Sequence, residues 1–236
     1  MPDKRTGSVE SSLIENRVFH PSPDFVDKAL VSNIEKRNEM WRNSIENPDQ
    51  FWAEMAEHID WFKKWDKVEE YDFGDNFYIR YFDGGKLNAS YNCLDRHLKS
   101  WRRNKAALIW QGEPLEESKT YTYLQLHREV CKFANVLKDL GVKKGDRVTV
   151  YLPMIPELVI TLLACARIGA IHSVVFGGFS SEALRDRILD AGAETLITCN
   201  YGYRSGKVLQ VKKTADEALL DCPNVKNCVV VRRIDR

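Results

Sequence analysis

Two short runs of residues have the composition of a binding site for a phosphorylated ligand. They are Phe176-Gly177-Gly178 and Arg204-Ser205-Gly206-Lys207. Glycine has no Cβ atom, so the first run lets a ligand approach the main chain closely. In the second run, the guanidinium can hold a phosphate through two parallel hydrogen bonds and the ammonium can hold it as a point charge. The two runs together predict an anion-binding site beside the main chain of the two glycines.

Each run also has a purely structural interpretation. A Gly-Gly pair forms a tight turn without any ligand, and two cations in a polar loop can simply face solvent. Position favours binding, because the first run ends one apolar stretch and the second lies just beyond the next. In open α/β sheets, ligands bind at the carboxyl ends of parallel strands.

The segments around these runs alternate between apolar strands and helices. We expect strands over 147–152, 171–176 and 195–198, helices over 158–168 and 180–191, and a further helix and strand over 215–220 and 228–231. The stretch 171–176 is apolar throughout most of its length, as a parallel strand covered on both faces should be. These features predict an α/β fold with a mostly parallel sheet and crossover helices.

The first part of the chain is built differently. All six tryptophans lie within the first 110 residues, and the second half is rich in Val, Ile, Leu and Ala. We divide the chain into a loosely ordered tail over 1–20, a Trp-rich helical region over 21–105 and an α/β part over 106–236. Within the helical region, 71–92 is rich in turn residues and predicts a hairpin or an irregular lid.

Two helices in this outline have clear signals. Thr122 is expected to cap a helix whose inward residues include Leu126 and Val130, and which ends before Gly141. An amphipathic stripe also begins after Pro48, at Phe51, Met55, Ile59 and Phe62. It predicts one helix that presents a core or docking face, or less often a ligand cage.

Composition excludes several classes of function. The 35 Lys and Arg residues balance 34 Asp and Glu residues, so no global field attracts nucleic acid or an acidic membrane. No stretch approaches the roughly 18 apolar residues that span a bilayer. The six cysteines lack CxxC spacing and several lie in apolar runs, which indicates packing residues in a reducing compartment and no zinc site. We therefore expect a cytoplasmic protein without a metal site of its own.

Longer runs around the first candidate residues resemble a known family. Tyr151-Leu-Pro-Met-Ile-Pro-Glu and the stretch from Leu163 to Ser180, LACARIGAIHSVVFGGFS, closely resemble the AMP-forming acetyl-coenzyme A synthetases of the adenylate-forming superfamily. The run from Leu87 to Leu98 is similar to the segment that joins this family's N-terminal helical region to its large domain. The resemblance covers about residues 20 to 236, so 106–236 corresponds to the first part of the AMP-binding domain.

The resemblance implies a function and a ligand. Members join acetate to ATP, release pyrophosphate and pass the acetyl group from the adenylate to the thiol of coenzyme A (CoA), with Mg²⁺ as the metal ion. By this resemblance, Phe176, Gly177 and Gly178 line the route of CoA, and Arg204, Ser205, Gly206 and Lys207 hold its phosphorylated ribose end. Lys207 stands where the family has Arg or Lys, and a lysine cannot grip a phosphate in bidentate fashion.

The sequence departs from the family in length. It lacks the family's Ser/Thr/Gly-rich loop with Pro-Lys-Gly, the acetate pocket, the ribose-binding aspartate and the C-terminal domain with its lysine. We therefore expect the N-terminal part of such an enzyme, with the remainder of the enzyme as its partner and the ATP and Mg²⁺ sites elsewhere. No residue here is assigned as catalytic, and the piece alone is expected to be inactive. Propionyl- and acetoacetyl-CoA synthetases, a non-catalytic interaction remnant and an NAD-dependent oxidoreductase are the alternatives; the last lacks GxGxxG.

Overall fold

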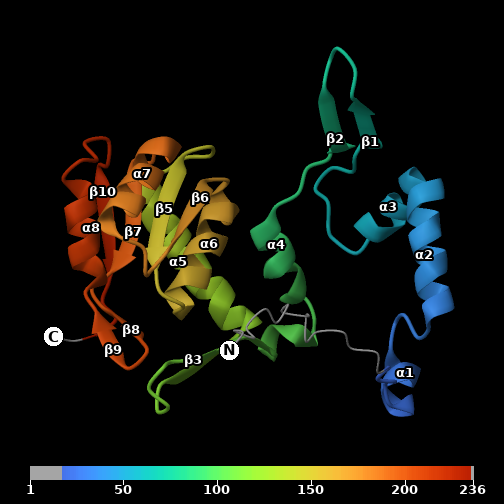
Figure 1. Cartoon of the computed structure of the whole chain (residues 1–236), viewed down its shortest axis with the longest axis horizontal. Coiled ribbons are helices and arrows are strands. Elements are labelled where there is room, and N and C mark those ends of the chain that lie inside the picture. The colour runs from blue at the N-terminus through green and yellow to red at the C-terminus, as the bar shows by residue number, and fades with distance from the viewer. Residues whose placement is uncertain (1–17, 235–236) are drawn as a thin grey trace, which may run out of the picture. The chain divides into compact units, whose positions relative to one another are not determined.

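A computed structural model describes residues 18–234 of the chain (Figure 1). It forms two compact units, the first ending at Ala56 and the second beginning at Glu57. The predicted tail lies almost wholly outside the described residues. The predicted boundary between 105 and 106 stays a prediction. Among the described residues, no helix is both long and apolar enough to cross a membrane.

The described part of the first unit is helical. It contains α1 (Pro23–Lys28), α2 (Ile34–Glu46) and α3 (Pro48–Ala56). Asn33 caps α2 by accepting a hydrogen bond from the main-chain N–H of Lys36 at 2.8 Å. The single helix predicted from Pro48 to Phe62 is wrong in extent, because α3 ends at Ala56. Beyond it, the side chains of Arg96 and Asn92 bond to the main chain at His58 and Asp60, which competes with helix formation there.

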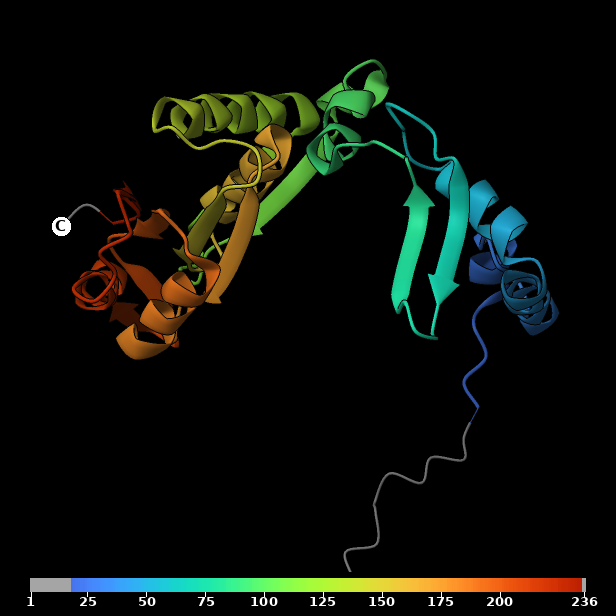
Figure 2. The ribbon, with the colours of Figure 1, turned by 90° about the horizontal axis from the view of Figure 1, so that it is seen from above.

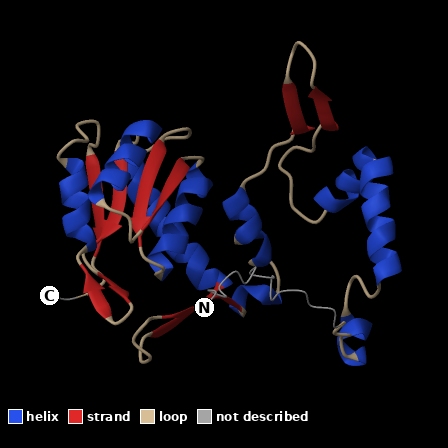
Figure 3. Ribbon diagram, viewed as in Figure 1, coloured by secondary structure: helices blue, strands red, loops and turns tan. Residues whose placement is uncertain are grey.

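A four-stranded sheet forms the centre of the second unit, as Figure 3 shows. Its strands are β5 (Arg147–Leu152), β6 (Ile171–Phe176), β7 (Thr195–Cys199) and β10 (Asn227–Val231), in the order β10-β7-β5-β6. All neighbouring pairs are parallel. Every residue of β7 is buried, whereas the expectation that 171–176 is covered on both faces is wrong, because β6 is the edge strand and most of its residues are exposed. The predicted α/β fold with a mostly parallel sheet is confirmed.

The connections place helices on both faces of the sheet. They are α6 (Pro156–Ile168), α7 (Ser181–Ala191) and α8 (Val211–Leu219). Strands β6 and β7 lie on opposite sides of β5 in the sheet, so the chain crosses the sheet in one direction through α6 and in the other through α7. Because both crossovers are right-handed, α6 and α7 must lie on opposite faces of the sheet. Figure 2 shows this: α6 lies on one side with α5 (Tyr123–Asp139), and α7 and α8 lie on the other.

Helix α5 (Tyr123–Asp139) follows a separate two-stranded sheet of β3 (Ala106–Gln111) and β4 (Ser118–Thr122). The predicted cap at Thr122 is confirmed as a full capping box. The Thr122 hydroxyl accepts from the Gln125 N–H at 3.2 Å, and the Gln125 side chain accepts from the Thr122 N–H at 2.8 Å. Leu126, Val130 and Leu137 face the core, so the amphipathic pattern of this helix also holds.

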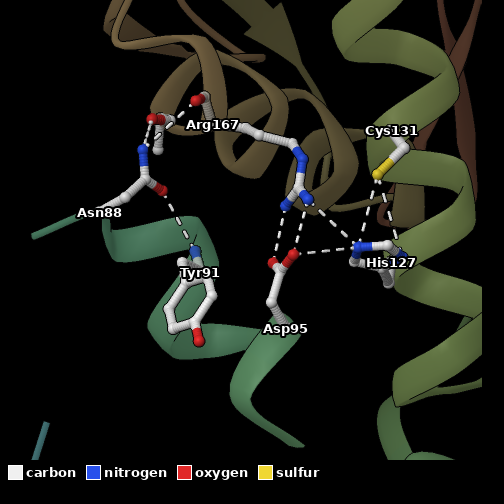
Figure 4. Close-up of polar contacts among 7 residues, drawn as sticks. Asn88, Tyr91, Asp95, His127, Cys131 and Arg167 are labelled. Atoms are coloured by element: carbon white, nitrogen blue, oxygen red, sulfur yellow. Dashed lines mark hydrogen bonds and ion pairs between the residues drawn. The ribbon is translucent and has the colours of Figure 1, made fainter. Parts of the chain in front are cut away.

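The hairpin predicted within 71–92 is present but lies earlier in the chain, as β1 (Lys67–Asp72) paired with β2 (Tyr78–Asp83). It leads into α4 (Ala89–Cys93) and two 3-10 turns, η1 (Asp95–His97) and η2 (Trp101–Asn104). The Asn88 side chain donates to the carbonyls of Ala166 and Arg167 at 2.8 and 3.3 Å, at the end of α6 (Figure 4). This contact fixes the segment against the α/β part.

A polar cluster strengthens the same attachment (Figure 4). Arg167 holds both carboxylate oxygens of Asp95 at 2.7 Å, and His127 Nε2 lies 3.2 Å from Asp95 Oδ1. The Cys131 thiol is 3.5 Å from the same His127 nitrogen. The thiol also lies 3.9 Å from Nδ1, so it approaches both ring nitrogens and lacks the directed bond to a single nitrogen that a nucleophilic triad needs. The cluster is therefore an ion pair that fastens the segment to α5 and α6.

The cysteines differ in their surroundings. Cys165, Cys199 and Cys222 are buried, which fits the prediction of packing residues, whereas Cys93 and Cys228 are exposed. Burial raises the pKa of Cys165 and Cys199 to about 12, so both remain neutral thiols near pH 7. All six are free of disulfide bonds.

Candidate functional site

The first candidate run forms a β-turn at the carboxyl end of β6. The N–H of Phe179 donates to the carbonyl of Phe176 at 3.0 Å, so Gly177 and Gly178 are the two central residues of the turn. The Tyr151 hydroxyl supports the turn from the core by donating to the Phe179 carbonyl at 2.8 Å. Burial raises the pKa of Tyr151, which keeps this hydroxyl protonated.

Space, and not backbone conformation, explains the two glycines. Neither has the positive φ that favours glycine. A Cβ on Gly177 would lie 3.1 Å from the main-chain atoms Leu152 O and Pro153 N, and a Cβ on Gly178 would overlap Nη1 of Arg204. The turn therefore passes close to the loop after β5 on one side and beneath a guanidinium on the other.

The second candidate run is the tip of a two-stranded ribbon, β8 (Gly202–Arg204) and β9 (Lys207–Leu209). The sequence predicted a loop here, so its regular pairing is a correction. Ser205 and Gly206 have φ of 51° and 73°, as the two central residues of a type I′ hairpin turn do. Arg204 pairs directly with Lys207, which places both cationic side chains on one face of the ribbon. Like charges that face each other repel, so this pair favours a bound anion.

The two runs meet at a cavity of about 290 Å³. The cavity is lined by residues of six segments: 110–113, 152–155, 176–178, 203–204, Leu209 and Arg233. The loop after β5 leads to α6 and the loop after β6 leads to α7, on opposite faces of the sheet. A crevice opens between two strands at such a switch point, where α/β proteins bind ligands.

The predicted residues occupy different places around the cavity. Phe176, Gly177, Gly178 and Arg204 line it, and Ser205, Gly206 and Lys207 lie beyond its lining at the exposed ribbon tip. The Arg204 guanidinium lies 5.2 Å from the centre of the Phe176 ring, which is 55% exposed. The ring of Phe179 meets that of Phe176 edge to face at 5.8 Å. The geometry therefore offers an open aromatic and cationic surface.

The opposite wall of the cavity was not found from the sequence. Trp110 on β3 donates its indole N–H to the Met154 carbonyl at 2.7 Å. Arg233, which follows β10, lies over the Trp110 ring at 5.2 Å and the Tyr203 ring at 5.4 Å. Its guanidinium also forms an ion pair with Glu117. These residues are far apart in the chain, and no spacing in the sequence brings them together.

A larger hollow of about 690 Å³ lies between β4, α5 and α6. It contains none of the predicted residues, and its lining includes a surface ion pair of Lys132 and Glu129 at 2.9 Å. Its greater volume does not make it the better candidate, because it is not at the carboxyl ends of the strands.

The side chains that line the cavity are mostly aromatic, apolar or charged. Its charged lining residues are Glu113, Arg204 and Arg233, and it lacks histidine, cysteine and serine. Within residues 18–234, no three His, Cys, Asp or Glu side chains are grouped to hold a metal ion. The cavity thus brings the guanidinium groups of Arg204 and Arg233 together with the main chain of Gly177 and Gly178.

Comparisons with known proteins agree with this fold. The profile of the AMP-binding enzyme family matches residues 94–235, and that of the acetyl-coenzyme A synthetase N-terminus matches residues 37–93. The chain is 52% identical over 215 residues to an acetyl-coenzyme A synthetase of Alkalilimnicola ehrlichii and 54% identical over 220 residues to one of Leptospira biflexa. These matches cover 91% and 93% of this chain and 33% of each relative.

A solved structure is also similar. An acetoacetyl-CoA synthetase from Streptomyces lividans superimposes with a TM-score of 0.75 and 26% identity, over 83% of this chain and 30% of that protein. The present chain spans about a third of the length of the curated relatives it matches. It belongs to the AMP-binding enzyme family, and its residues correspond to the N-terminal part of an acetyl-coenzyme A synthetase.

Proposed function

We propose that the chain is the N-terminal part of an AMP-forming acetate-CoA ligase and supplies part of its CoA site. The complete enzyme would activate acetate with ATP, release pyrophosphate and transfer the acetyl group from acetyl-adenylate to the thiol of CoA. The names of the curated relatives support the reaction. The ATP and Mg²⁺ sites belong, in this proposal, to the remainder of the same enzyme, and the setting is the cytoplasm.

One observation carries the assignment of the CoA site. Arg204 and Lys207 share a face of the ribbon, and Arg204 lies beside the bare main chain of Gly178 at the switch point of the sheet. The thiol carrier combines a long thin arm with a phosphorylated ribose. The glycine turn lines the cavity with main chain that the arm could contact, and the paired cations match the phosphate end.

The test uses the complete enzyme with Arg204→Ala and Lys207→Ala. Loss of one charged hydrogen bond weakens binding by about 1.5 to 3 kcal/mol, so the Kd for CoA should rise about 10- to 150-fold for Arg204→Ala. The penalty should shrink with dephospho-CoA, which lacks the 3′-phosphate.

Arg128→Ala is the matched control, because this exposed arginine lines the larger hollow between β4, α5 and α6. It should leave CoA binding unchanged. An unchanged CoA affinity in Arg204→Ala, or a loss in Arg128→Ala alone, would remove the assignment.

Acyl chain preference is a separate question, since the similar solved structure is an acetoacetyl-CoA synthetase. Rates of the complete enzyme with acetate, propionate and acetoacetate distinguish the three ligases. The isolated chain should show no acetate-dependent exchange of pyrophosphate into ATP. A complete enzyme inactive with all three acids would instead favour a non-catalytic interaction role.

A further inference from the structure

The ribbon that carries Arg204 is held from its other face. Side chains alternate along a strand, so Tyr203 points to the face opposite Arg204. Arg233 lies over the Tyr203 ring at 5.4 Å and over the Trp110 ring at 5.2 Å. The guanidinium is thus in contact with two aromatic rings, one on the ribbon and one on β3, an arrangement that cation–π attraction favours.

Further contacts fix Arg233 itself. Its guanidinium forms an ion pair with Glu117, and the two side chains are 16% and 29% exposed. Its main-chain N–H donates to the Asn200 side chain at 2.7 Å, at the end of β7. Its position is therefore set by both the sheet and the loop between β3 and β4.

The same loop reaches the ribbon a second time. Glu113 accepts a hydrogen bond from the N–H of Gly206 at the ribbon tip. The loop over 112–117 thus contacts the tip directly and contacts the base of the ribbon through Glu117 and Arg233. Both ends of the ribbon are held, although its two strands have only three residues each.

We propose that Arg233 is a positioning residue for the CoA site. It acts through Tyr203, which its guanidinium links to Trp110, so that Arg204 stays beside Gly178 and above the Phe176 ring. Arg233 itself need not touch the ligand's phosphate, because its charge is already paired with Glu117. This inference rests on the proposed function. It adds to the CoA site a residue that is distant in the sequence from Gly178 and Arg204.

The experiment measures two reactions of the complete enzyme. Acetate-dependent exchange of pyrophosphate into ATP does not require CoA, whereas formation of acetyl-CoA does. Arg233→Ala should raise the KM for CoA about 5- to 20-fold and leave the exchange rate within about twofold of the wild-type value. Arg233→Lys keeps the charge for Glu117 but loses the planar group that stacks on the rings, so it should show a smaller rise.

Two further variants test the route through the aromatic ring. Tyr203→Ala should raise the KM for CoA as Arg233→Ala does, and Tyr203→Phe, which keeps the ring, should not. Arg232→Ala is the matched control, since Arg232 is the exposed neighbour of Arg233. It should behave like the wild type.

The outcomes separate this inference from the assignment of the site. An unchanged KM for CoA in Arg233→Ala, with the expected loss in Arg204→Ala, overturns the positioning role alone. Equal losses of exchange and of acetyl-CoA formation in both Arg233 variants also overturn it, because they show a general structural defect. No effect in Arg204→Ala overturns the site itself.

Discussion

Replacing Gly178 by alanine should damage ligand binding without damaging the fold. The added methyl group would overlap Nη1 of Arg204, the far end of a flexible side chain, and would come within 3.0 Å of the Phe176 ring. The main chain has no positive φ at this position, so alanine can adopt its conformation. The expected response is that the Arg204 guanidinium moves away from the turn.

The magnitude follows from what Arg204 loses. If the displaced guanidinium no longer reaches the ligand, one charged hydrogen bond of about 1.5 to 3 kcal/mol is lost, and the Kd for CoA rises about 10- to 150-fold. Stability should stay equal or rise by up to about 1 kcal/mol, because alanine reduces the conformational freedom of the unfolded chain. Gly177→Ala should instead lower the stability of the folded state, because its methyl group would crowd main-chain atoms of Leu152 and Pro153.

Titration calorimetry of the complete enzyme with CoA, together with thermal unfolding, measures both quantities. In an Arg204→Ala background, Gly178→Ala should cause no further loss of affinity, because the group it displaces is gone. Full affinity in Gly178→Ala would refute the reasoning. So would an equal loss with and without Arg204, since the methyl group would then be acting on the ligand directly.

Two further predictions concern folding of this chain. Thr122→Ala removes the capping box of α5 and should lower the free energy of unfolding by about 1 kcal/mol in urea titrations; an unchanged midpoint would contradict the role of the cap. Burial raises the pKa of Asp95, but the hydrogen bonds and charges of Arg167 and His127 outweigh it and hold the pKa below 3.8. The ionised form of Asp95 is thus favoured in the folded state. Ionised Asp95 therefore stabilises the fold above about pH 4, and this stabilisation is lost as the pH falls through the lowered pKa. Asp95→Asn should be less stable than the wild type at pH 7, with a difference that narrows below pH 4; a constant difference would refute the linkage.

Local patterns in the sequence predict much of the fold. The strands β5, β6 and β7 were found because each is a short apolar run between turn residues, and α5 because Thr122 and an apolar periodicity mark it. The order of the strands was not predictable in this way. It depends on which edge of β5 each neighbour occupies, and no single segment encodes that choice.

Some residues of the candidate site could likewise be predicted from local sequence patterns, and others could not. Gly177 and Gly178 were found as a turn after a strand, although the reason for them is contact with Pro153 and Arg204. The hairpin at Ser205-Gly206 had a signal that was missed, a two-residue turn between short extended segments. Arg233 had none, because its partner Glu117 is 116 residues away.

The contact of Arg233 with the ribbon of β8 and β9 has a consequence for shortened forms of the protein. A version that ended just after β10 would keep all four strands of the sheet. It would lose the Arg233 guanidinium, which lies over the Tyr203 ring of the short hairpin. A loss of ligand binding in such a version would therefore not show that the sheet had failed to fold. Truncation experiments on this domain need to measure the two properties separately.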